Sequence, residues 1–384
     1  MQLTLEKVSL EDSRMISLVK LLRSVPNLMF DSVSIEPKHW EAIASGLSDS
    51  GIRVKTICLN NFQTTDETIP HIIKALLSIA TVELWRMSLS PEHWAALATA
   101  LRDTDHCIED LSLCNIFIDD TNVSHFSSCV SQVRTVWLSS LGKCGTYTTY
   151  SAFPDMKGNV WSCLDQELAK EDKKLKRLKL SMIDNVSLIR NIGHASHCIS
   201  NVENVIIHDV CLGPEEWAIL GRELAGREKT LRRLELYQIL GVDQENIGEI
   251  AKCLSYVPEV RLSSFCSISI FWSGLYKAFQ ETGIQMNHLE LVSISVDDVS
   301  VEDFSSCVMS VPEVKMEKVK LKDSWPSFMK QLSSPDTALH KLYLTECWPS
   351  DQVVEQIASL DNWNMELEEG EFMLNNNCIV LTKK

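Results

Sequence analysis

A short pattern of apolar and polar residues recurs along the chain and predicts the same amphipathic helix each time. It occupies residues 37–47, 91–101 and 214–224, with proline first, tryptophan fourth and apolar residues three and seven positions after the tryptophan. Proline suits the first helical turn, where its missing N–H leaves no hydrogen bond unmade. Apolar residues at these spacings share one face of a helix. A pattern that returns in this way is typical of a repeat protein.

A second pattern alternates with period two and predicts a short strand between successive helices. An apolar, a variable and another apolar residue follow each other, as in Leu111-Ser112-Leu113 and Leu234-Glu235-Leu236. Alternation points the two apolar side chains to one side of a strand. The first apolar residue of each pair is used as a strand mark, and thirteen marks can be placed, at Leu3, Leu28, Ile57, Val82, Leu111, Val136, Leu178, Val205, Leu234, Val260, Leu289, Val314 and Leu342.

The strand marks are spaced alternately by about 29 and about 25 residues, which predicts two alternating repeat types. In one repeat type a tryptophan lies seventeen residues before the next strand mark, as Trp40 does before Ile57 (57 − 40 = 17), and this spacing fixes the register. The other tryptophans at this position are Trp94, Trp161, Trp217, Trp272 and Trp325. This constancy predicts that the tryptophans fill the core between helices and sheet. In the other type, Asp66 is expected to cap the helix that starts near Ile69.

Strand, helix and spacing together are typical of leucine-rich repeats. The predicted fold class is α/β, a leucine-rich repeat solenoid or horseshoe with parallel strands on the concave face and helices on the convex face. Residues 1–361 are expected to form about 13 alternating 25/29-residue repeats, and residues 362–384 a hairpin-like C-terminal cap. The interval from Val136 to Leu178 is 42 residues (178 − 136 = 42), which indicates an inserted loop at 142–153.

The position five residues after each strand mark departs from the usual repeat, which carries Asn or Cys there. Cys347 alone conforms to this rule. Apolar residues at this position predict loops that are packed by burial rather than by side-chain hydrogen bonds. These residues are Val8, Val33, Phe62, Met87, Ile116, Leu141, Val210, Ile239, Phe265, Ile294 and Val319.

The alternating full-helix repeats resemble the ribonuclease-inhibitor class of leucine-rich repeats. The degenerate consensus, acidic balance and strand opening at Leu3 resemble the C-terminal region of NLR proteins, the cytosolic innate immune receptors. This resemblance implies a non-enzymatic ligand-sensing or autoinhibitory domain, whose partner is a protein ligand or an upstream nucleotide-binding domain of the same polypeptide. We also expect that a preceding domain shields the first repeat. The alternative is a stand-alone inhibitor or scaffold that binds a protein such as a ribonuclease.

Composition and net charge argue against several other classes of function. The net charge of −16 argues against nucleic-acid or anionic-membrane partners, and the apolar runs are too short to cross a bilayer. Thirteen cysteines without any CxxC pair are typical of a reducing compartment, so we predict a cytoplasmic protein. No phosphate loop or catalytic arrangement is apparent, and His194 with His197 lacks a second ligand pair for zinc. We therefore expect no enzyme activity, cofactor or metal.

Binding is expected on the strand positions beside and between the inward-pointing pairs, which face the concave surface. Aromatic residues and arginines are enriched at protein interfaces, although scattered exposed aromatics can also be incidental. The candidate concave-face residues are Trp85, Trp137, Tyr237, Tyr343, Glu83, Arg177, Lys179, Arg233, Glu235, Arg261 and Glu290, and the candidates in the inserted loop are Tyr147, Tyr150 and Phe153. Nine acids and six bases occupy this face (9 − 6 = 3), so acid is not concentrated there.

Overall fold

The structure is a computed structural model in which the chain divides into two compact units, Met1–Val202 and Glu203–Lys384. It describes residues 2–7, 12–22, 24–48, 54–104, 108–139, 160–170, 173–181, 191–209, 211–226, 230–239, 245–264, 269–283, 286–347, 349–369 and 377–384.

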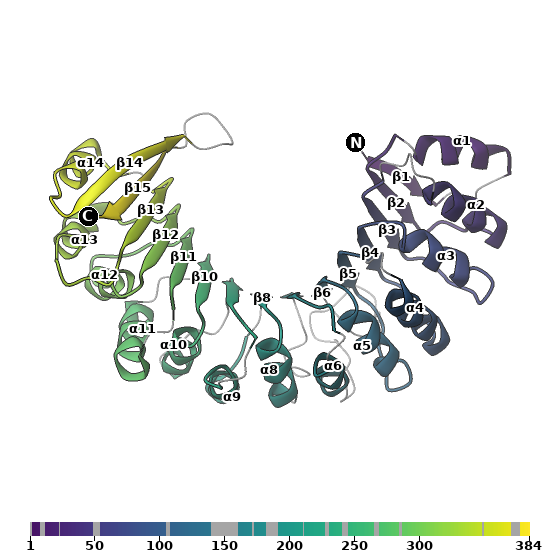
Figure 1. The fold of residues 1–384 in the computed structure, drawn as a ribbon, viewed down its shortest axis with the longest axis horizontal. Helices are drawn as coiled ribbons and strands as arrows, with labels where there is room; N and C mark the ends of the chain where they lie inside the picture. The colour runs from purple at the N-terminus through teal and green to yellow at the C-terminus, as the bar shows by residue number, and fades with distance from the viewer. Residues whose placement is uncertain are drawn as a thin grey trace. The chain divides into compact units, whose positions relative to one another are not determined.

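Unit 1 alternates seven strands with helices (Figure 1). The strands are β1 (Gln2–Glu6), β2 (Asn27–Asp31), β3 (Thr56–Asn60), β4 (Thr81–Trp85), β5 (Asp110–Cys114), β6 (Thr135–Ser139) and β7 (Arg177–Ser181). The helices are α1 (Asp12–Leu22), α2 (Pro37–Leu47), α3 (Ile69–Leu76), α4 (Pro91–Asp103), α5 (Val123–Ser131), α6 (Val160–Leu168) and α8 (Ile192–Ser200). Each strand pairs in parallel with the next in sequence.

Unit 2 repeats this arrangement and ends in a hairpin. Its strands are β8 (Asn204–His208), β9 (Arg233–Tyr237), β10 (Glu259–Ser263), β11 (His288–Val292), β12 (Glu313–Glu317), β13 (Lys341–Thr345), β14 (Trp363–Glu369) and β15 (Asn377–Lys383). Its helices are α9 (Pro214–Leu224), α10 (Ile247–Ser255), α11 (Ser269–Thr282), α12 (Val301–Met309), the 3-10 turn η1 (Lys322–Ser324), α13 (Trp325–Leu332) and α14 (Asp351–Ala358).

The sheet register confirms all thirteen strand marks. Each mark is the second residue of its strand, and within each unit neighbouring marks face each other, as in Leu3 with Leu28 and Leu289 with Val314. Because side chains alternate, the second and fourth residues of a strand point toward the helices and the first, third and fifth point away. In each unit the helices line one face of the sheet (Figure 1), which leaves an open sheet face made by those three positions. The chain is therefore an α/β leucine-rich repeat solenoid, as predicted.

The helix tryptophans lie in the core, also as predicted. Trp40, Trp94, Trp161, Trp217 and Trp272 are at most 2% exposed. Phenylalanine rings of the following repeat meet three of these indoles edge-on, in the pairs Trp40–Phe62, Trp94–Phe126 and Trp272–Phe304 at centroid distances of 5.5, 5.3 and 4.8 Å. The tryptophans thus couple each repeat to its neighbour.

In the described part of the chain, the residue directly after each of the strands β1 to β5 and β8 to β13 is left-handed and is never glycine. Examples are Ser32 with φ 53° and Ser293 with φ 55°. The backbone N–H of Ser32 donates to the Asn60 carbonyl at 3.0 Å, so this turn continues the hydrogen-bond ladder past the strand. The next residue is apolar and buried at Val33, Phe62, Met87, Ile116, Ile239, Ile294 and Val319, which confirms the predicted loop packing at these positions. The other predicted positions, Val8, Leu141, Val210 and Phe265, lie outside the described residues. Only Cys347 differs, since its thiol donates to the Met316 carbonyl at 3.3 Å.

One predicted helix cap is wrong. The Asp66 Oδ1 atom lies 3.0 Å from Nε2 of the buried His93 on α4, and the cap position of α3 is occupied by Thr68. Because His93 is buried beside the start of α4, a carboxylate from the preceding repeat satisfies its ring nitrogen. His39 on α2 repeats this relation with Asp12 at 2.7 Å.

The two ends of the chain differ in how they cover the core. At the C-terminal end the predicted hairpin is present, with β15 antiparallel to both β13 and β14, and Trp363 Nε1 donates to the Leu332 carbonyl at 3.0 Å. At the other end, Leu3 and Leu5 of β1 are only half-buried, whereas Leu28 and Phe30 of β2 are buried. The domain limits at 361 and 362 stay predictions. Within the described ranges, no helix is long and apolar enough to span a bilayer.

Candidate protein-binding surface

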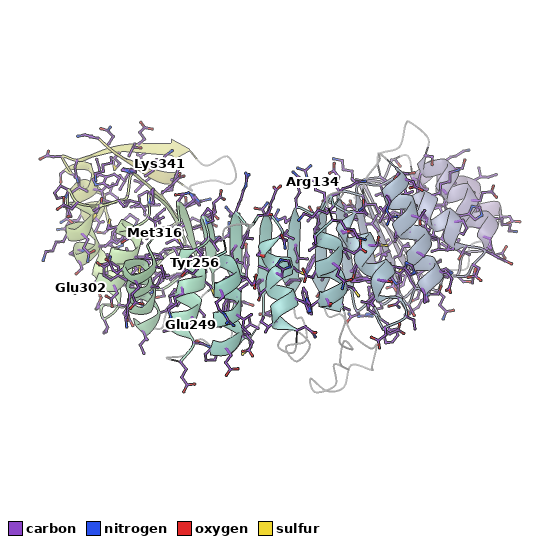
Figure 2. All side chains as sticks on the ribbon, turned by 60° about the horizontal axis from the view of Figure 1, so that its bottom comes forward. Arg134, Glu249, Tyr256, Glu302, Met316 and Lys341 are labelled. Carbon is purple, nitrogen blue, oxygen red and sulfur yellow. The ribbon has the colours of Figure 1, made fainter. Side chains whose placement is uncertain are left out.

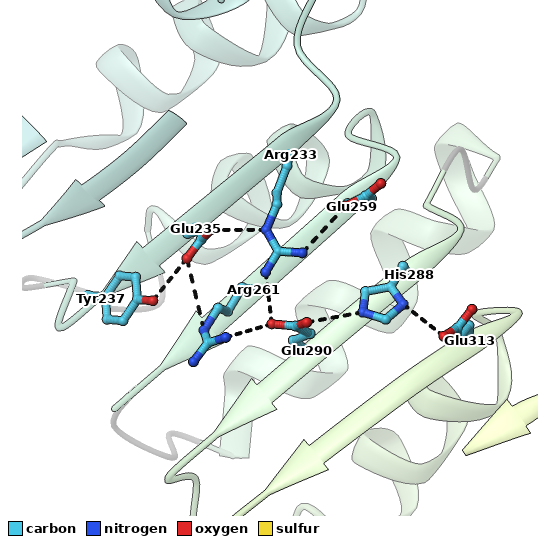
Figure 3. A network of polar contacts seen from close by, with 8 residues as sticks. All are labelled: Arg233, Glu235, Tyr237, Glu259, Arg261, His288, Glu290 and Glu313. Atoms are coloured by element: carbon cyan, nitrogen blue, oxygen red, sulfur yellow. Dashed lines mark hydrogen bonds and ion pairs between the residues drawn. The ribbon is translucent and has the colours of Figure 1, made fainter. Parts of the chain in front are cut away.

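The predicted concave-face residues all lie on the open sheet face, because each occupies a first, third or fifth strand position. Four of them, Arg233, Glu235, Arg261 and Glu290, come together on the adjacent strands β9, β10 and β11 (Figure 3). Tyr237 joins them from the fifth position of β9. The residues Tyr147, Tyr150 and Phe153 of the predicted inserted loop lie outside the described residues.

Two arginines and two glutamates form the centre of this cluster. Arg233 donates from Nε to Glu235 at 2.9 Å and from Nη2 to Glu290 at 2.8 Å. Arg261 donates from Nη1 to the same Glu290 oxygen at 2.8 Å. The hydroxyl of Tyr237 donates to the second oxygen of Glu235 at 2.9 Å. Glu235 is buried as a result, so it holds its neighbours in place rather than facing a ligand.

Three further residues extend the cluster toward β12. His288 lies 3.4 Å from Glu290 and 3.5 Å from Glu313, and Arg233 lies 3.4 Å from Glu259. Together with the five residues above they form what we call the charged network (Figure 3). The sequence did not single out His288, although its position directly before the mark Leu289 places it on the open sheet face.

Charges of opposite sign alternate across the strands of the charged network. Third positions run Glu235, Arg261, Glu290 and Lys315 along β9 to β12, and each faces the next in register. Opposite charges directly across a strand pair are stabilising. The network holds four glutamates and two arginines (4 − 2 = 2), so its ion pairs fix the side chains in place and leave a small surplus of acid.

The protonation of Glu290 follows from these contacts. A hydrogen bond with His288, helped by the charges of Arg233 and Arg261, outweighs burial and lowers the pKa of Glu290 to about 2. Burial, together with the hydrogen bond to Glu235, raises the pKa of Tyr237. At neutral pH the network thus holds an ionised Glu290 and a protonated Tyr237.

In unit 1 the open sheet face carries an exposed tryptophan. Trp137, the third residue of β6, is 39% exposed, and Nζ of Lys179 on β7 lies 3.8 Å from its ring centroid. That distance is typical of a cation–π contact. Ser112 of β5 faces Trp137 from the other side. The other predicted residues of unit 1 lie on β7 and β4. Arg177 is exposed at the start of β7, and Glu83 and Trp85 are partly buried on β4.

The remaining predicted residue, Tyr343, lies on β13, where Lys341 Nζ is 4.6 Å from its ring centroid. It faces Lys315 of β12 in register. The predicted face residues are therefore divided among the charged network, the surroundings of Trp137, and Tyr343.

The described residues contain no group of three or more histidine, cysteine or acidic side chains suited to a metal ion. His194 and His197, the candidates weighed from sequence, both contact the Asp165 carboxylate of α6 through Nδ1. A hollow of about 620 Å³ between α9 and α10 is lined by charged residues, including Glu249, and by Tyr256. Figure 2 labels these two residues. Its Lys252 is paired with Glu249 at 2.8 Å, so these charges already satisfy each other.

Comparison with known proteins adds little to this geometry. No protein-family model matches the chain, and no curated protein matches it. Among solved structures, the chain is similar to the TLR13 chain of a TLR13–ssRNA13 complex, with 14% identity and a TM-score of 0.38. The match covers 78% of this chain and 40% of that chain, so this chain spans less than half its length. The strand register assigns this protein to the leucine-rich repeat fold class. A structural similarity with a TM-score this low carries no argument about function.

Proposed function

We propose that the chain is a non-enzymatic protein-recognition domain that binds its partner on the open sheet face. One observation carries the proposal: the helix-facing strand positions are almost uniformly apolar, whereas the open positions hold a preordered set of charged and aromatic side chains. A surface whose side chains are already fixed loses less conformational entropy on binding. The charged network fixes Arg261 and Tyr237 in this way.

A peptide-library selection on the immobilised full chain tests this proposal. Selected peptides should lose affinity when the open sheet face is changed by Trp137→Ala or Arg261→Gln. The matched control is Lys74→Glu, because Lys74 is exposed on helix α3. Peptides that respond only to Lys74→Glu would place recognition on the helix side and contradict the proposal.

We further propose that the domain is the ligand-sensing or autoinhibitory part of a cytosolic NLR-like receptor. The surface of α1 supports this, because Ile16 and Leu21 are 67% and 49% exposed. Exposed apolar side chains of this kind are stabilised when another domain covers them. The gene sequence upstream of the Met1 codon tests the assignment: a nucleotide-binding domain with a phosphate loop is expected, and its absence contradicts a receptor.

The alternative is a stand-alone inhibitor or scaffold that binds a protein such as a ribonuclease. Its test is inhibition of a basic ribonuclease by the purified chain, with an affinity that falls steeply as salt rises. The open positions of β9 to β12 hold five acids and three bases (5 − 3 = 2), and this small surplus disfavours the alternative, because a very basic enzyme requires a strong concentration of acid. Absence of a nucleic-acid partner stays a prediction, and a mobility-shift assay with single-stranded RNA checks it.

A further inference from the structure

Strands β2, β3 and β4 lie side by side in unit 1 and carry acid but no base on the open sheet face (Figure 1). Their open positions are Asn27, Met29, Asp31, Thr56, Cys58, Asn60, Thr81, Glu83 and Trp85. We call five of these residues the acidic site, namely Asp31, Cys58, Asn60, Glu83 and Trp85.

The middle strand of the acidic site carries short buried side chains, and the flanking strands carry the acids. Cys58 and Asn60 are 6% and 7% exposed, whereas Asp31, Glu83 and Trp85 are partly buried. In register, Asn60 faces Asp31 on one side and Trp85 on the other, and Cys58 faces Glu83. Strands lie roughly 4.8 Å apart, so β2 and β4 are about 10 Å apart. Two carboxylates and an indole therefore surround the side chains of β3.

The carboxylates of the acidic site are not neutralised by neighbouring bases. Within the described part of the chain, neither Asp31 nor Glu83 forms an ion pair with a lysine or an arginine. Asp31 accepts a hydrogen bond from Ser32 Oγ at 2.9 Å, and Glu83 faces the uncharged Cys58 and Ser112 in register. A partly buried acid of this kind is stabilised by a ligand that supplies a cation.

The charged residues that border these strands leave the site acidic. Lys55 precedes β3, at the end of the strand opposite to the fifth positions. Arg86 follows β4, and its charge acts on Cys114 of β5. Asp110, at the first position of β5, is exposed and adds another acid. A cationic ligand is therefore attracted to this part of the face.

Cys58 and Asn60 also favour a ligand that donates hydrogen bonds. Burial, with the charges of Glu83 and Asp31, raises the pKa of the Cys58 thiol to about 12, so both acids converge on a neutral group. The Oδ1 atom of Asn60 is buried and has no hydrogen-bond partner among the described residues. A half turn of the amide exchanges its oxygen and nitrogen, so the oxygen can accept from a ligand on the open face.

We propose that the acidic site binds an arginine side chain of the protein partner. The guanidinium group lies over β3, donates to Asp31 and Glu83 on either side, and packs its flat face on the indole of Trp85. A planar cation with five donors suits several acceptors beside an aromatic ring better than an ammonium group does. This inference rests on the proposed function and specifies the chemistry of the partner.

The charged network of unit 2 shows the same arrangement completed within the chain. Its strand β10 carries Arg261 at the third position, between glutamates of both flanking strands. Nη1 of Arg261 donates to Glu290 at 2.8 Å, and Nε lies 4.0 Å from Glu235. Its guanidinium carbon lies 5.9 Å from the ring centroid of Tyr237. In the acidic site the third position of the middle strand is Cys58, so the partner supplies the arginine that this strand lacks.

Fluorescence anisotropy with the full chain tests the proposal. The probe is a labelled arginine-containing peptide selected from the library, and its reference forms carry lysine or citrulline in place of arginine. Citrulline keeps the shape and removes the charge, so it should bind at least about tenfold more weakly, and lysine should lose less. Asp31→Asn and Glu83→Gln should each weaken the arginine peptide by about tenfold.

Controls separate the site from attraction by net charge and from misfolding. Glu41→Gln is the matched control, because Glu41 is exposed on helix α2 and the change also removes one negative charge from unit 1. It should leave the affinity unchanged. Circular-dichroism spectra check that Asp31→Asn and Glu83→Gln are folded. In addition, Glu83→Lys should bind the peptide form that carries glutamate in place of arginine more tightly than the wild type does.

Three outcomes would overturn the inference. Equal losses for Glu41→Gln and Glu83→Gln would reduce the effect to net charge, and equal affinities of the arginine and citrulline peptides would remove the cation from recognition. Library peptides that contain no arginine, or that depend on Arg261 but not on Glu83, would leave the proposed function standing and remove this inference alone. If the proposed function itself fails, no library peptide responds to any open-face variant.

Discussion

The thiol of Cys253 on α10 donates a hydrogen bond of 2.9 Å to the backbone carbonyl oxygen of Trp217 on α9. The same relation joins other repeats, in the pairs Cys129–Trp94, Cys198–Trp161 and Cys307–Trp272 at 3.3, 3.5 and 3.2 Å. Burial raises the pKa of each of these thiols, which keeps them protonated as donors. A buried cysteine thus ties one helix to the tryptophan of the helix before it.

The first repeat lacks this bond, because Ala75 stands where the thiol would be, thirty-five residues after Trp40 (75 − 40 = 35). We predict that Cys253→Ala lowers the free energy of unfolding by about 1–2 kcal/mol, through a lost hydrogen bond and a small cavity. The reverse change Ala75→Cys should alter it by less than about 1 kcal/mol. Urea denaturation measures both, and an unchanged Cys253→Ala midpoint would contradict the role given to the thiol.

The core role of the tryptophans gives a second prediction. Trp94→Ala should lower the free energy of unfolding by about 3–5 kcal/mol, the usual range for a large buried aromatic. Trp137→Ala is the matched control, because Trp137 is 39% exposed, and it should change stability by about 1 kcal/mol or less. A melting temperature for Trp94→Ala within error of the wild type would refute the core assignment.

The repeat architecture could be predicted from the sequence because it follows from side-chain periodicity alone. The two-residue alternation around Leu111, and the constant spacing of seventeen residues between Trp94 and Leu111, specify which side chains face the helices. Both depend only on local spacing. The hydrogen bonds of the buried thiols could not be predicted in this way, because their carbonyl partners belong to the preceding helix and are not visible in a local pattern.

The contacts of the charged network could not be predicted in the same way. The sequence places Arg233, Arg261 and Glu290 on one face, but which of them pair depends on side-chain rotamers and on the register between strands. The partner of Asp66 could not be predicted either, because an aspartate just before a helix is expected to cap that helix. Packing of α4 against the preceding repeat instead brings His93 to its carboxylate.

Acid should weaken the contribution of Glu290 to stability. Its pKa in the folded chain is about 2, below the 4.5 of an unperturbed glutamate, so the stabilisation is fully present above pH 4.5 and is lost as the pH falls toward 2. At about 1.4 kcal/mol for each pH unit, the loss is at most about 3 kcal/mol. Urea denaturation between pH 5 and pH 2 measures it.

The matched variant for that titration is Glu290→Gln, which keeps the shape and removes the charge. It should be less stable than the wild type at pH 5, and the two should converge as the pH approaches 2. A constant difference in free energy across this range would show that the Arg233 and Arg261 contacts with Glu290 do not stabilise the fold.

The left-handed turn after each strand makes a further prediction. Ser293 is exposed and has φ 55°, a conformation that β-branched residues rarely adopt. Ser293→Val should therefore lower the free energy of unfolding by about 1–3 kcal/mol, and Ser293→Gly by less. Ser295→Val provides the comparison, because Ser295 is exposed two residues later without a positive φ. Equal melting temperatures for the two valine variants would contradict strain at this turn.

Amide hydrogen exchange of the full chain, with and without a library-selected peptide, tests most directly whether the open sheet face recognises protein. The account predicts that bound peptide slows amide exchange in strands of the open sheet face. Protection confined to the helices, with the strands unchanged, would contradict it.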